Sequence, residues 1–429
     1  MSLNTEVAVV GGGIGGLTLG LKLARSKIDV MVIEKLEEPS SIYKGELLQP
    51  KSLQIFEKLD VLKDIQCNGF SFSRIAFEEG KNEFFMDYRI LPGDYDYAVM
   101  IEHEKLKRIL LSQALQYPNF QYLSGAFGKG YCDGRLIVER KNRKERLFVK
   151  ADFYVGAEGR NSITRKEMNS KIKKIDYNHH FLTVTFPRPQ SLDEGKIISK
   201  DERFLGLFPL PKAKVRSVYL IPKGSYKEFH AKGIDHFHQN YLELFPELKG
   251  YVTRLKDWSD IQLMIPTAFY ADKYVNGRYA ILGDAAHTVH PMAGEGMNMA
   301  IQDADILGEL YESMYSTGRI SPGRLKWYEK VRKPRAEKMI SLSHLSALVY
   351  SYSNRFITGI RRKGLKQMER DKTLQFKQML NVSGLGYWSE SALDRFVQAG
   401  MLPARNRGLS SKAKRNYFYT EKDDYPWKS

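Results

Sequence analysis

The sequence predicts an α/β protein in which a parallel-sheet domain carries an inserted, mostly antiparallel β-sheet and is followed by C-terminal helices. Three observations predict it. The chain opens with an apolar run, a glycine-rich turn and a helical pattern, and the same succession returns around residues 279–307. Between them, residues 174–271 consist of short runs rich in Phe, Tyr, Val and Leu, separated by Pro and Gly.

The first glycine-rich turn has the spacing of a dinucleotide site. Residues 7–10 form an apolar run, and Gly11, Gly13 and Gly16 follow it as G-x-G-x-x-G. The first glycine permits the tight turn, the second lets the backbone approach a pyrophosphate, and the third lets helix and strand pack closely. Glu34 ends the next apolar run, where a carboxylate can accept hydrogen bonds from ribose hydroxyls. We therefore expect a Rossmann-like domain with a bound dinucleotide, rather than a glycine-rich turn without a ligand.

The second glycine-rich turn, residues 283–298, stands between an apolar run at 279–282 and a helical pattern at 297–307. A turn placed there directs backbone N–H groups and the positive end of a helix at whatever it holds. Taken alone, it is compatible with any anion.

Composition is that of a globular protein without a spanning helix. Hydrophobic residues make up 42% of the chain and charged residues 27%. We find no signal-peptide pattern and no apolar run of about 20 residues. Cys67 and Cys132 have no metal-ligand spacing, and His230, His236 and His238 lack a metal-binding pattern. We expect a cytoplasmic protein without a metal site.

The net charge of +17 has three interpretations. It can be a solvated basic surface, an attraction for anionic partners such as a nicotinamide dinucleotide, or an affinity for an anionic membrane. The basic amphipathic stretch 353–377 motivates the membrane hypothesis, although helices packed on the first domain explain that stretch more simply. We expect no nucleic-acid binding, because no recognised motif is present.

Domain boundaries follow from these changes of pattern. The cofactor domain is expected to comprise residues 1–75, 96–173 and 272–345, and the inserted domain residues 76–95 and 174–271. Residues 346–429 are expected to form a helical region with a basic tail, loosely held from about residue 405 onward.

A third motif, Gly156-Ala157-Glu158-Gly159-Arg160, lies between the two turns. The three motifs in this order resemble the FAD-dependent monooxygenases of the para-hydroxybenzoate hydroxylase type, which include ubiquinone-biosynthesis hydroxylases. The resemblance covers about residues 5–340.

The resemblance implies a set of FAD-binding residues. The first turn would hold the pyrophosphate and Glu34 the adenosine ribose, with Lys35 beside it. Asp284 would bind the ribitol chain, Pro291 would lie beside the flavin ring, and residues 294–298 would cradle its pyrimidine edge. The full set of candidates is Gly11, Gly13, Gly16, Glu34, Lys35, Lys44, Gly45, His103, Glu158, Gly283, Asp284, Pro291, Gly294, Gly296, Met297 and Asn298.

Three of these positions depart from the family pattern. Lys44, before Gly45, stands where the family usually has an arginine, and His103 where it has an arginine or a glutamine. Glu158 replaces an aspartate. Lysine keeps the charge but loses the planar fork of arginine. For Lys44 and His103, surface residues beside a turn or a helix are the competing interpretation, and His287 and His290 are interpreted as structural.

The implied chemistry is the hydroxylation of an aromatic, polyketide-like or quinone-like molecule. NADH or NADPH would reduce FAD, O2 would form a flavin C4a-hydroperoxide, and the protein would supply position and a dry pocket. The aromatic residues of 204–211 suit such a substrate, or belong to the core. No residue can be named as a catalytic base, and the sequence does not predict an oligomeric state.

Other functions remain open at this point. They are a halogenase, a prenyl reductase, and a membrane-associated flavoprotein with little turnover. The halogenase is disfavoured because Trp258, Trp327, Trp388 and Trp427 form no W-x-W-x-I-P motif.

Overall fold

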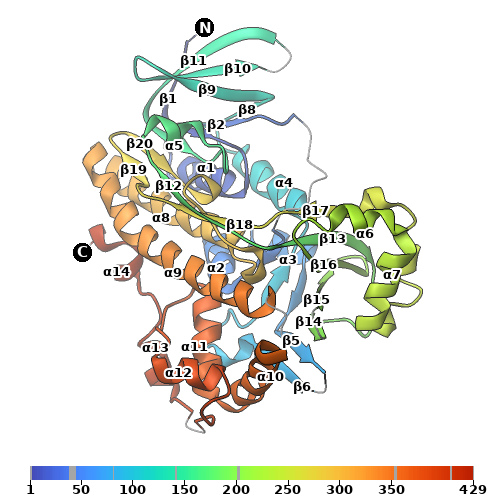
Figure 1. Cartoon of the computed structure of the whole chain (residues 1–429). Helices are drawn as coiled ribbons and strands as arrows, with labels where there is room; N and C mark the ends of the chain where they lie inside the picture. Colours follow the sequence, from blue (N-terminus) through green and yellow to red (C-terminus); the bar gives the residue numbers. More distant parts are fainter. Residues whose placement is uncertain are drawn as a thin grey trace.

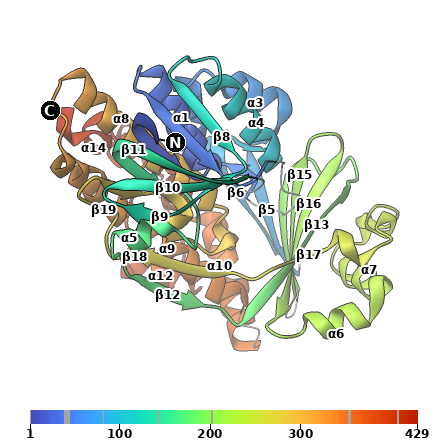
Figure 2. The same cartoon turned by 90° about the horizontal axis from the view of Figure 1, so that it is seen from above.

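A computed structural model describes residues 2–37, 45–80, 82–140, 143–200, 203–351, 355–405 and 408–428. Two sheets dominate it, and Figure 2 shows them side by side with the C-terminal helices beneath. None of the described helices combines the length and the apolar composition that a membrane crossing requires.

The larger sheet, called here the nucleotide sheet, has eight strands among the described residues, with the path β19-β20-β11-β1-β2-β8 and β10 and β9 attached to β11. Strands β20, β11, β1, β2 and β8 run parallel. Their bounds are β1 Ser2–Val10, β2 Val30–Glu34, β8 Phe120–Ser124, β9 Ala126–Cys132, β10 Arg135–Arg140, β11 Arg143–Gly156, β19 Val275–Asn276 and β20 Tyr279–Ile281.

Successive side chains of β1 point to opposite faces of this sheet, and both faces carry an apolar layer. Val7 and Val9 belong to the core formed with the helices, whereas Ala8 and Val10 pack toward the β9–β10 hairpin. The helices on the first side are α1 Ile14–Arg25, α4 His103–Ala114 and α8 Gly296–Ser316, and α1 packs against both of the others (Figure 1). A short helix, α5 Ile163–Glu167, follows β11.

The second sheet, called here the inserted sheet, has seven strands within the described ranges, in the order β17-β13-β16-β15-β14-β5-β6. Neighbours are antiparallel except for β14 and β5. Its strands are β5 Arg74–Glu79, β6 Asn82–Asp87, β13 His179–Pro187, β14 Gly195–Lys200, β15 Arg203–Leu210, β16 Lys214–Pro222 and β17 Gln262–Met264. Helices α6 Tyr226–Ala231 and α7 Gly233–Leu244 cover its outer side (Figure 2).

Short strands join the two units. Strand β12 (Ile172–Asp176) leads into the inserted sheet and β18 (Thr267–Ala271) leads out, and they pair antiparallel. Strand β21 (His287–Thr288) pairs with β18. A separate small sheet consists of β3 Leu47–Leu48, β7 Ala98–Met100 and β4 Phe70–Phe72, near helices α2 Pro50–Lys58 and α3 Leu62–Asn68.

The C-terminal part is helical, and Figure 1 shows α10 to α13 at the lower side of the molecule, α9 above them and α14 at the left edge. Their bounds are α9 Lys326–Ser351, α10 Arg355–Arg370, α11 Lys372–Ser383, α12 Ala392–Gln398, α13 Ser411–Arg415 and α14 Glu421–Asp424. Helix α9 is continuous through Pro334. Helix α10 packs on β6, α11 and α12, and its Leu365 is buried.

The predicted fold class is confirmed: a Rossmann-like α/β domain, an inserted and mostly antiparallel sheet, and C-terminal helices. The exact domain boundaries stay a prediction. The expectation of a loosely held tail is wrong for its last residues, because Asp424 and Tyr425 are buried. Asp424 lies 2.7 Å from Lys51 and 2.6 Å from Arg335, and the Tyr425 hydroxyl donates to Asp305 at 2.7 Å.

Candidate cofactor and substrate site

One cavity of about 1840 Å³ runs from the carboxyl ends of the parallel strands, past the second turn, to the space between the inserted sheet and helices α9–α12. Small-molecule sites usually measure about 300–1,000 Å³, so this cavity has room for more than one ligand group. Every candidate residue in the described ranges lines it except Asn298. Lys44 lies outside the described residues.

The first turn is shaped by backbone contacts. Gly11 has φ +112°, and a Cβ there would stand 2.2 Å from the carbonyl oxygen of Ala157. A Cβ at Gly16 would stand 2.0 Å from the carbonyl oxygen of Gly11. A Cβ at Gly13 would instead meet no atom within 4 Å, because this residue faces the cavity at the start of α1. The open backbone at a helix N-terminus fits the pyrophosphate of a dinucleotide.

Glu34 braces this turn from the end of β2. One carboxylate oxygen accepts from the Gly12 N–H at 2.7 Å and the other from the Leu36 N–H at 2.9 Å. The side chain is mostly buried yet lines the cavity beside the exposed Lys35. An edge of the carboxylate therefore borders the space expected to hold a ribose.

The second turn is held by a buried carboxylate that the sequence analysis did not single out. Asp303, on α8, accepts from the Gly283 N–H at 2.9 Å, from His287 Nε2 at 2.6 Å and from Arg332 Nε at 2.6 Å. Although burial opposes ionisation, His287 and Arg332 hold the pKa of Asp303 down at about 2. In the sequence, the available signal was that α8 carries acidic residues and α9 carries basic ones. This signal does not specify which carboxylate pairs with which cation.

This arrangement places Asp284 at the cavity wall. Gly283 takes φ +57°, so the chain bends sharply after β20. The Asp284 side chain remains 45% exposed, and its carboxylate lies 3.8 Å from Arg160 of the middle motif. Asp284 is thus available to a ligand that spans the two turns.

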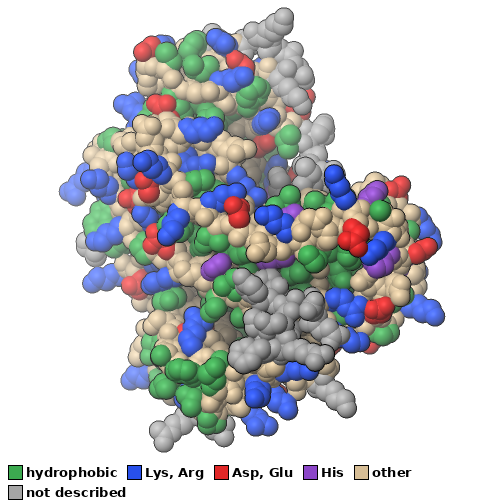
Figure 3. All heavy atoms as spheres, viewed as in Figure 1, with side chains coloured by type: hydrophobic (Ala, Val, Ile, Leu, Met, Phe, Trp, Pro, Cys, Tyr) green, Lys and Arg blue, Asp and Glu red, His purple; other side chains and the backbone are tan. Residues whose placement is uncertain are grey.

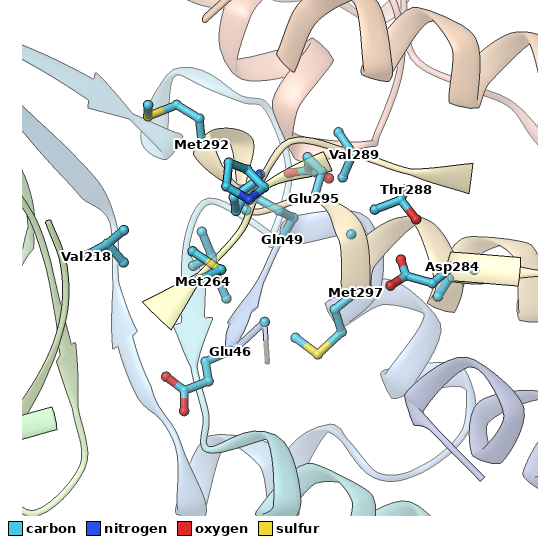
Figure 4. Close-up of a pocket in the computed structure, with 18 of the residues that line it drawn as sticks. Glu46, Gln49, Val218, Met264, Asp284, Thr288, Val289, Met292, Glu295 and Met297 are labelled. Atoms are coloured by element: carbon cyan, nitrogen blue, oxygen red, sulfur yellow. The ribbon is translucent and has the colours of Figure 1, made fainter. Parts of the chain in front are cut away.

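The middle of the second turn lies against the loop at Gly45. Gly294 has φ +65°, and Gly296 begins α8 with no side chain capping its N-terminus. Met297 is mostly buried, and a Cβ on Gly45 would be 3.5 Å from its Cβ. Figure 4 shows Met297 and Asp284 on one side of the open space, with Val218 and Met264 of the inserted sheet on the other.

His290 fixes the position of Pro291. Its Nδ1 accepts from the Met292 N–H at 3.2 Å, so neutral His290 carries its proton on Nε2, which lies 2.9 Å from Nε2 of His179 on β13. Burial lowers the pKa of His290 to about 3 and that of His179 to about 4. The interpretation of His290 as structural agrees with these contacts.

The Asn298 side chain makes its contacts within the protein, and a role of this residue beside the cofactor stays a prediction. Its amide donates to the carbonyls of Leu47 and Gly294 at 2.9 and 3.0 Å, and its oxygen accepts from the Gln49 N–H and the Ser52 hydroxyl at 2.8 and 2.7 Å. The side chain is completely buried and does not line the cavity. It ties the second turn to the start of α2 because one amide can satisfy four backbone or hydroxyl groups at once.

Glu158 also uses its side chain within the protein. One oxygen accepts from the Ser162 hydroxyl at 2.6 Å, and the other from the hydroxyl and N–H of Thr164 at 2.6 and 3.0 Å. The carboxylate thus secures the start of α5, and its role in cofactor binding stays a prediction.

His103 and Gly45, expected near the flavin, do meet. His103 begins α4, and its Nδ1 lies 3.2 Å from the Gly45 carbonyl. Next to Gly45, the buried Glu46 forms a two-pronged ion pair with Arg216 of β16 at 2.8 and 2.9 Å. This pair, absent from the sequence-based candidates, joins the loop to the inserted sheet.

Apolar side chains dominate the rest of the chamber beside the second turn. The described residues there include Phe181, Phe204, Phe208, Val218, Met264 and Met292. Glu295 is fully buried at this wall, and burial raises its pKa well above the usual range. Phe204 and Phe208 come from the segment whose aromatic residues suited an aromatic substrate.

The chain is similar to known proteins in sequence and in fold. The model of the FAD binding domain family matches residues 4–343. The chain is 28% identical over 309 residues to 6-methylpretetramide 4-monooxygenase of Streptomyces rimosus, covering 70% of this chain and 73% of that protein. It is 25% identical over 388 residues to ubiquinone hydroxylase UbiL of Rhodospirillum rubrum, covering 85% and 86%.

Among solved structures, p-nitrophenol 4-monooxygenase PnpA of Pseudomonas putida superposes with a TM-score of 0.77 at 17% identity, covering 89% of this chain and 98% of that one. This likeness concerns the fold. The family match, the open glycine turn and the named relatives agree on the cofactor and the reaction class. The chain therefore belongs to the FAD binding domain family and is a flavin-dependent monooxygenase.

Proposed function

We propose that the protein hydroxylates an aromatic or quinone-like small molecule at the chamber between Pro291 and the inserted sheet, using NADH or NADPH and O2. The observation that carries the proposal is the continuity of the cavity: one space joins the glycine turns to an apolar chamber that Phe181, Phe204 and Phe208 line. Such a chamber suits a flat ring.

The first turn and Glu34 would bind the adenosine and pyrophosphate part of FAD. Asp284 would bind the ribitol chain, and the backbone of residues 294–297 the pyrimidine edge. Bound flavin supplies the redox chemistry, accepting a hydride from the nicotinamide and transferring one oxygen atom from O2 to the substrate. The start of α8 stabilises negative charge beside residues 294–297 through its N–H groups.

The apolar side chains of the chamber position the ring and exclude water. Met292, Val218 and Met264 stand around the space beside the second turn (Figure 4). Excluding water strengthens electrostatic interactions at the reacting atoms and suppresses side reactions with water.

Two measurements test the hydroxylase. The purified protein is expected to show a flavin spectrum, and a panel of phenols and quinones is expected to stimulate NAD(P)H oxidation with one ¹⁸O atom from ¹⁸O2 in the product. NADH and NADPH are compared in parallel. Donor consumption without O2, or products that never contain ¹⁸O, would support a reductase and contradict the proposal.

Peripheral contact with an anionic membrane is a second proposal. Its support is the net charge of +17 and four exposed apolar side chains at α12 and the following turn, Leu393, Phe396, Met401 and Leu402. Figure 3 shows hydrophobic side chains gathered near the lower end of the molecule, with Lys and Arg beside them. Flotation with anionic vesicles is expected at low salt and is expected to weaken at high salt, whereas no flotation at low salt excludes this contact.

A further inference from the structure

The cavity extends beyond the space that FAD and a single ring require. Past the second turn it continues between the inserted sheet and α9, α10 and α11. The helices line this part with aliphatic side chains, namely Leu348, Val349, Ile360, Leu365, Met368 and Val382. On the facing side are Ile75 and Phe77 of β5. We call this part the helical compartment.

Apolar side chains make up most of the described lining of the helical compartment, and its uncharged polar side chains are Ser346, Gln378 and Gln398. Among its described lining residues, the charged side chains are Glu390 and Arg395 at the α12 end, and they pair with each other at 2.7 Å. The Glu390 oxygens are buried without a hydrogen-bond partner among the described residues, so polar character is concentrated at the α12 end. The aliphatic part between the inserted sheet and α9–α11 favours hydrocarbon over an anionic or cationic group.

The far end of the compartment lies close to the protein surface. Gln398 and Ala399 of the α12 region line it, and α12 also carries the exposed Leu393 and Phe396. A long apolar ligand could therefore extend from the second turn toward this surface without leaving an apolar environment.

We propose that the helical compartment is a separate subsite that holds an aliphatic tail of the substrate while the ring to be hydroxylated lies in the chamber beside Pro291. The proposal rests on the proposed function for the position of the ring, and on the compartment alone for the tail. It names the substrate class as a phenol or quinone that carries a hydrocarbon chain.

The test uses 4-alkylphenols with tails of one to nine carbons, titrated calorimetrically into the FAD-loaded protein. Each methylene that enters the compartment is expected to tighten binding about three- to fourfold until the compartment is full. Val349→Trp fills the compartment and is expected to abolish this dependence while leaving the affinity for 4-methylphenol within about twofold.

Two further variants keep the test decisive if Val349→Trp does not fold. Leu348→Ala enlarges the compartment, so the affinity is expected to keep rising to longer tails before it levels off. Leu115→Trp is the matched control, because Leu115 is 58% exposed at the end of α4 and does not line the cavity. It is expected to leave the dependence unchanged.

The outcomes separate the two proposals. Affinity that does not change with tail length in the unaltered protein, or that rises equally in a folded Val349→Trp, overturns the subsite. A clear tail dependence without ¹⁸O incorporation supports the subsite and contradicts phenol hydroxylation. Incorporation of ¹⁸O with an affinity that does not depend on tail length supports phenol hydroxylation and contradicts the subsite.

Discussion

The first turn, residues 11–16, and the second turn, residues 283–298, border one cavity but keep their shapes by different means. In the first, Gly11 and Gly16 are required because the backbone carbonyl oxygens of Ala157 and Gly11 occupy the places where their Cβ atoms would be. In the second, buried side chains of Asp303, His290 and Asn298 hold the backbone from behind. A turn shaped by sterics can be recognised from its own residues, whereas a turn held by remote side chains cannot.

The largest effect is expected at Asp303 of the second turn. Asp303→Asn leaves Arg332 buried without its carboxylate and is expected to lower the free energy of unfolding by about 3–5 kcal/mol. Chemical denaturation measures it. Asp176→Asn is the control, since its ion pair with Lys174 is exposed and is worth at most about 1 kcal/mol. Equal losses in both variants would contradict the role of Asp303.

The second-largest loss of stability is expected from a substitution at Gly11 of the first turn. Gly11→Ala forces a side chain into positive φ and against the Ala157 carbonyl, at an expected cost of about 3 kcal/mol together with loss of FAD. Gly13→Ala places its Cβ in open space, so the unfolding free energy should hardly change while FAD affinity falls. Calorimetry measures the unfolding free energy of the two variants, and FAD titration measures their affinity for FAD. If Gly13→Ala also kept its affinity, the first turn would not contact FAD.

The histidine pair gives the second turn a pH dependence. The pKa values of His290 and His179 are lowered to about 3 and about 4, so the unfolded chain binds more protons than the folded protein below about pH 6.5. Stability is therefore expected to fall as the pH is lowered, by about 2 kcal/mol between pH 7 and pH 5.5. Melting temperatures across this range measure it.

The control for this pH effect is a histidine substitution on the surface. His290→Gln should reduce the dependence by about half, because burial still lowers the pKa of His179. His230→Gln, at an exposed residue of α6, should leave it as it is. A steep dependence that persists in His290→Gln would assign the effect to other groups.

The smallest effect is expected at Glu158. Glu158→Gln keeps one acceptor for Ser162 or Thr164 and is expected to cost about 1 kcal/mol, with FAD affinity unchanged. Chemical denaturation measures the loss of stability, and quenching of flavin fluorescence measures the FAD affinity. A tenfold loss of FAD affinity without loss of stability would instead make Glu158 a cofactor ligand.

The same contrast explains which parts of the site the sequence could predict. Gly11, Gly13 and Gly16 are recognisable because turn, helix and strand adjoin in sequence. The partners of Asp303 are Gly283 and Arg332, which are 20 and 29 residues away from it, and Arg216 reaches Glu46 across 170 residues. The contacts of the Asn298 side chain could not be predicted, because a motif specifies a residue type and does not specify which way its side chain faces.

The fold was predictable for a related reason. Alternating and helical patterns act over a few residues, so the Rossmann-like unit, the inserted sheet and α7 could all be expected from local pattern. The last residues could not, because Lys51, Arg335 and Asp305, which bind Asp424 and Tyr425, are far away in sequence.

That terminal contact bears on the order of events during synthesis. Asp424 supplies the counter-charge for Lys51 and Arg335, and Tyr425 contacts the helix that begins at the second turn. A nascent chain that has completed the cofactor domain but not residues 424–425 lacks the carboxylate that pairs with Lys51 and Arg335. The cofactor domain is therefore expected to reach its full stability only after residues 424–425 have left the ribosome.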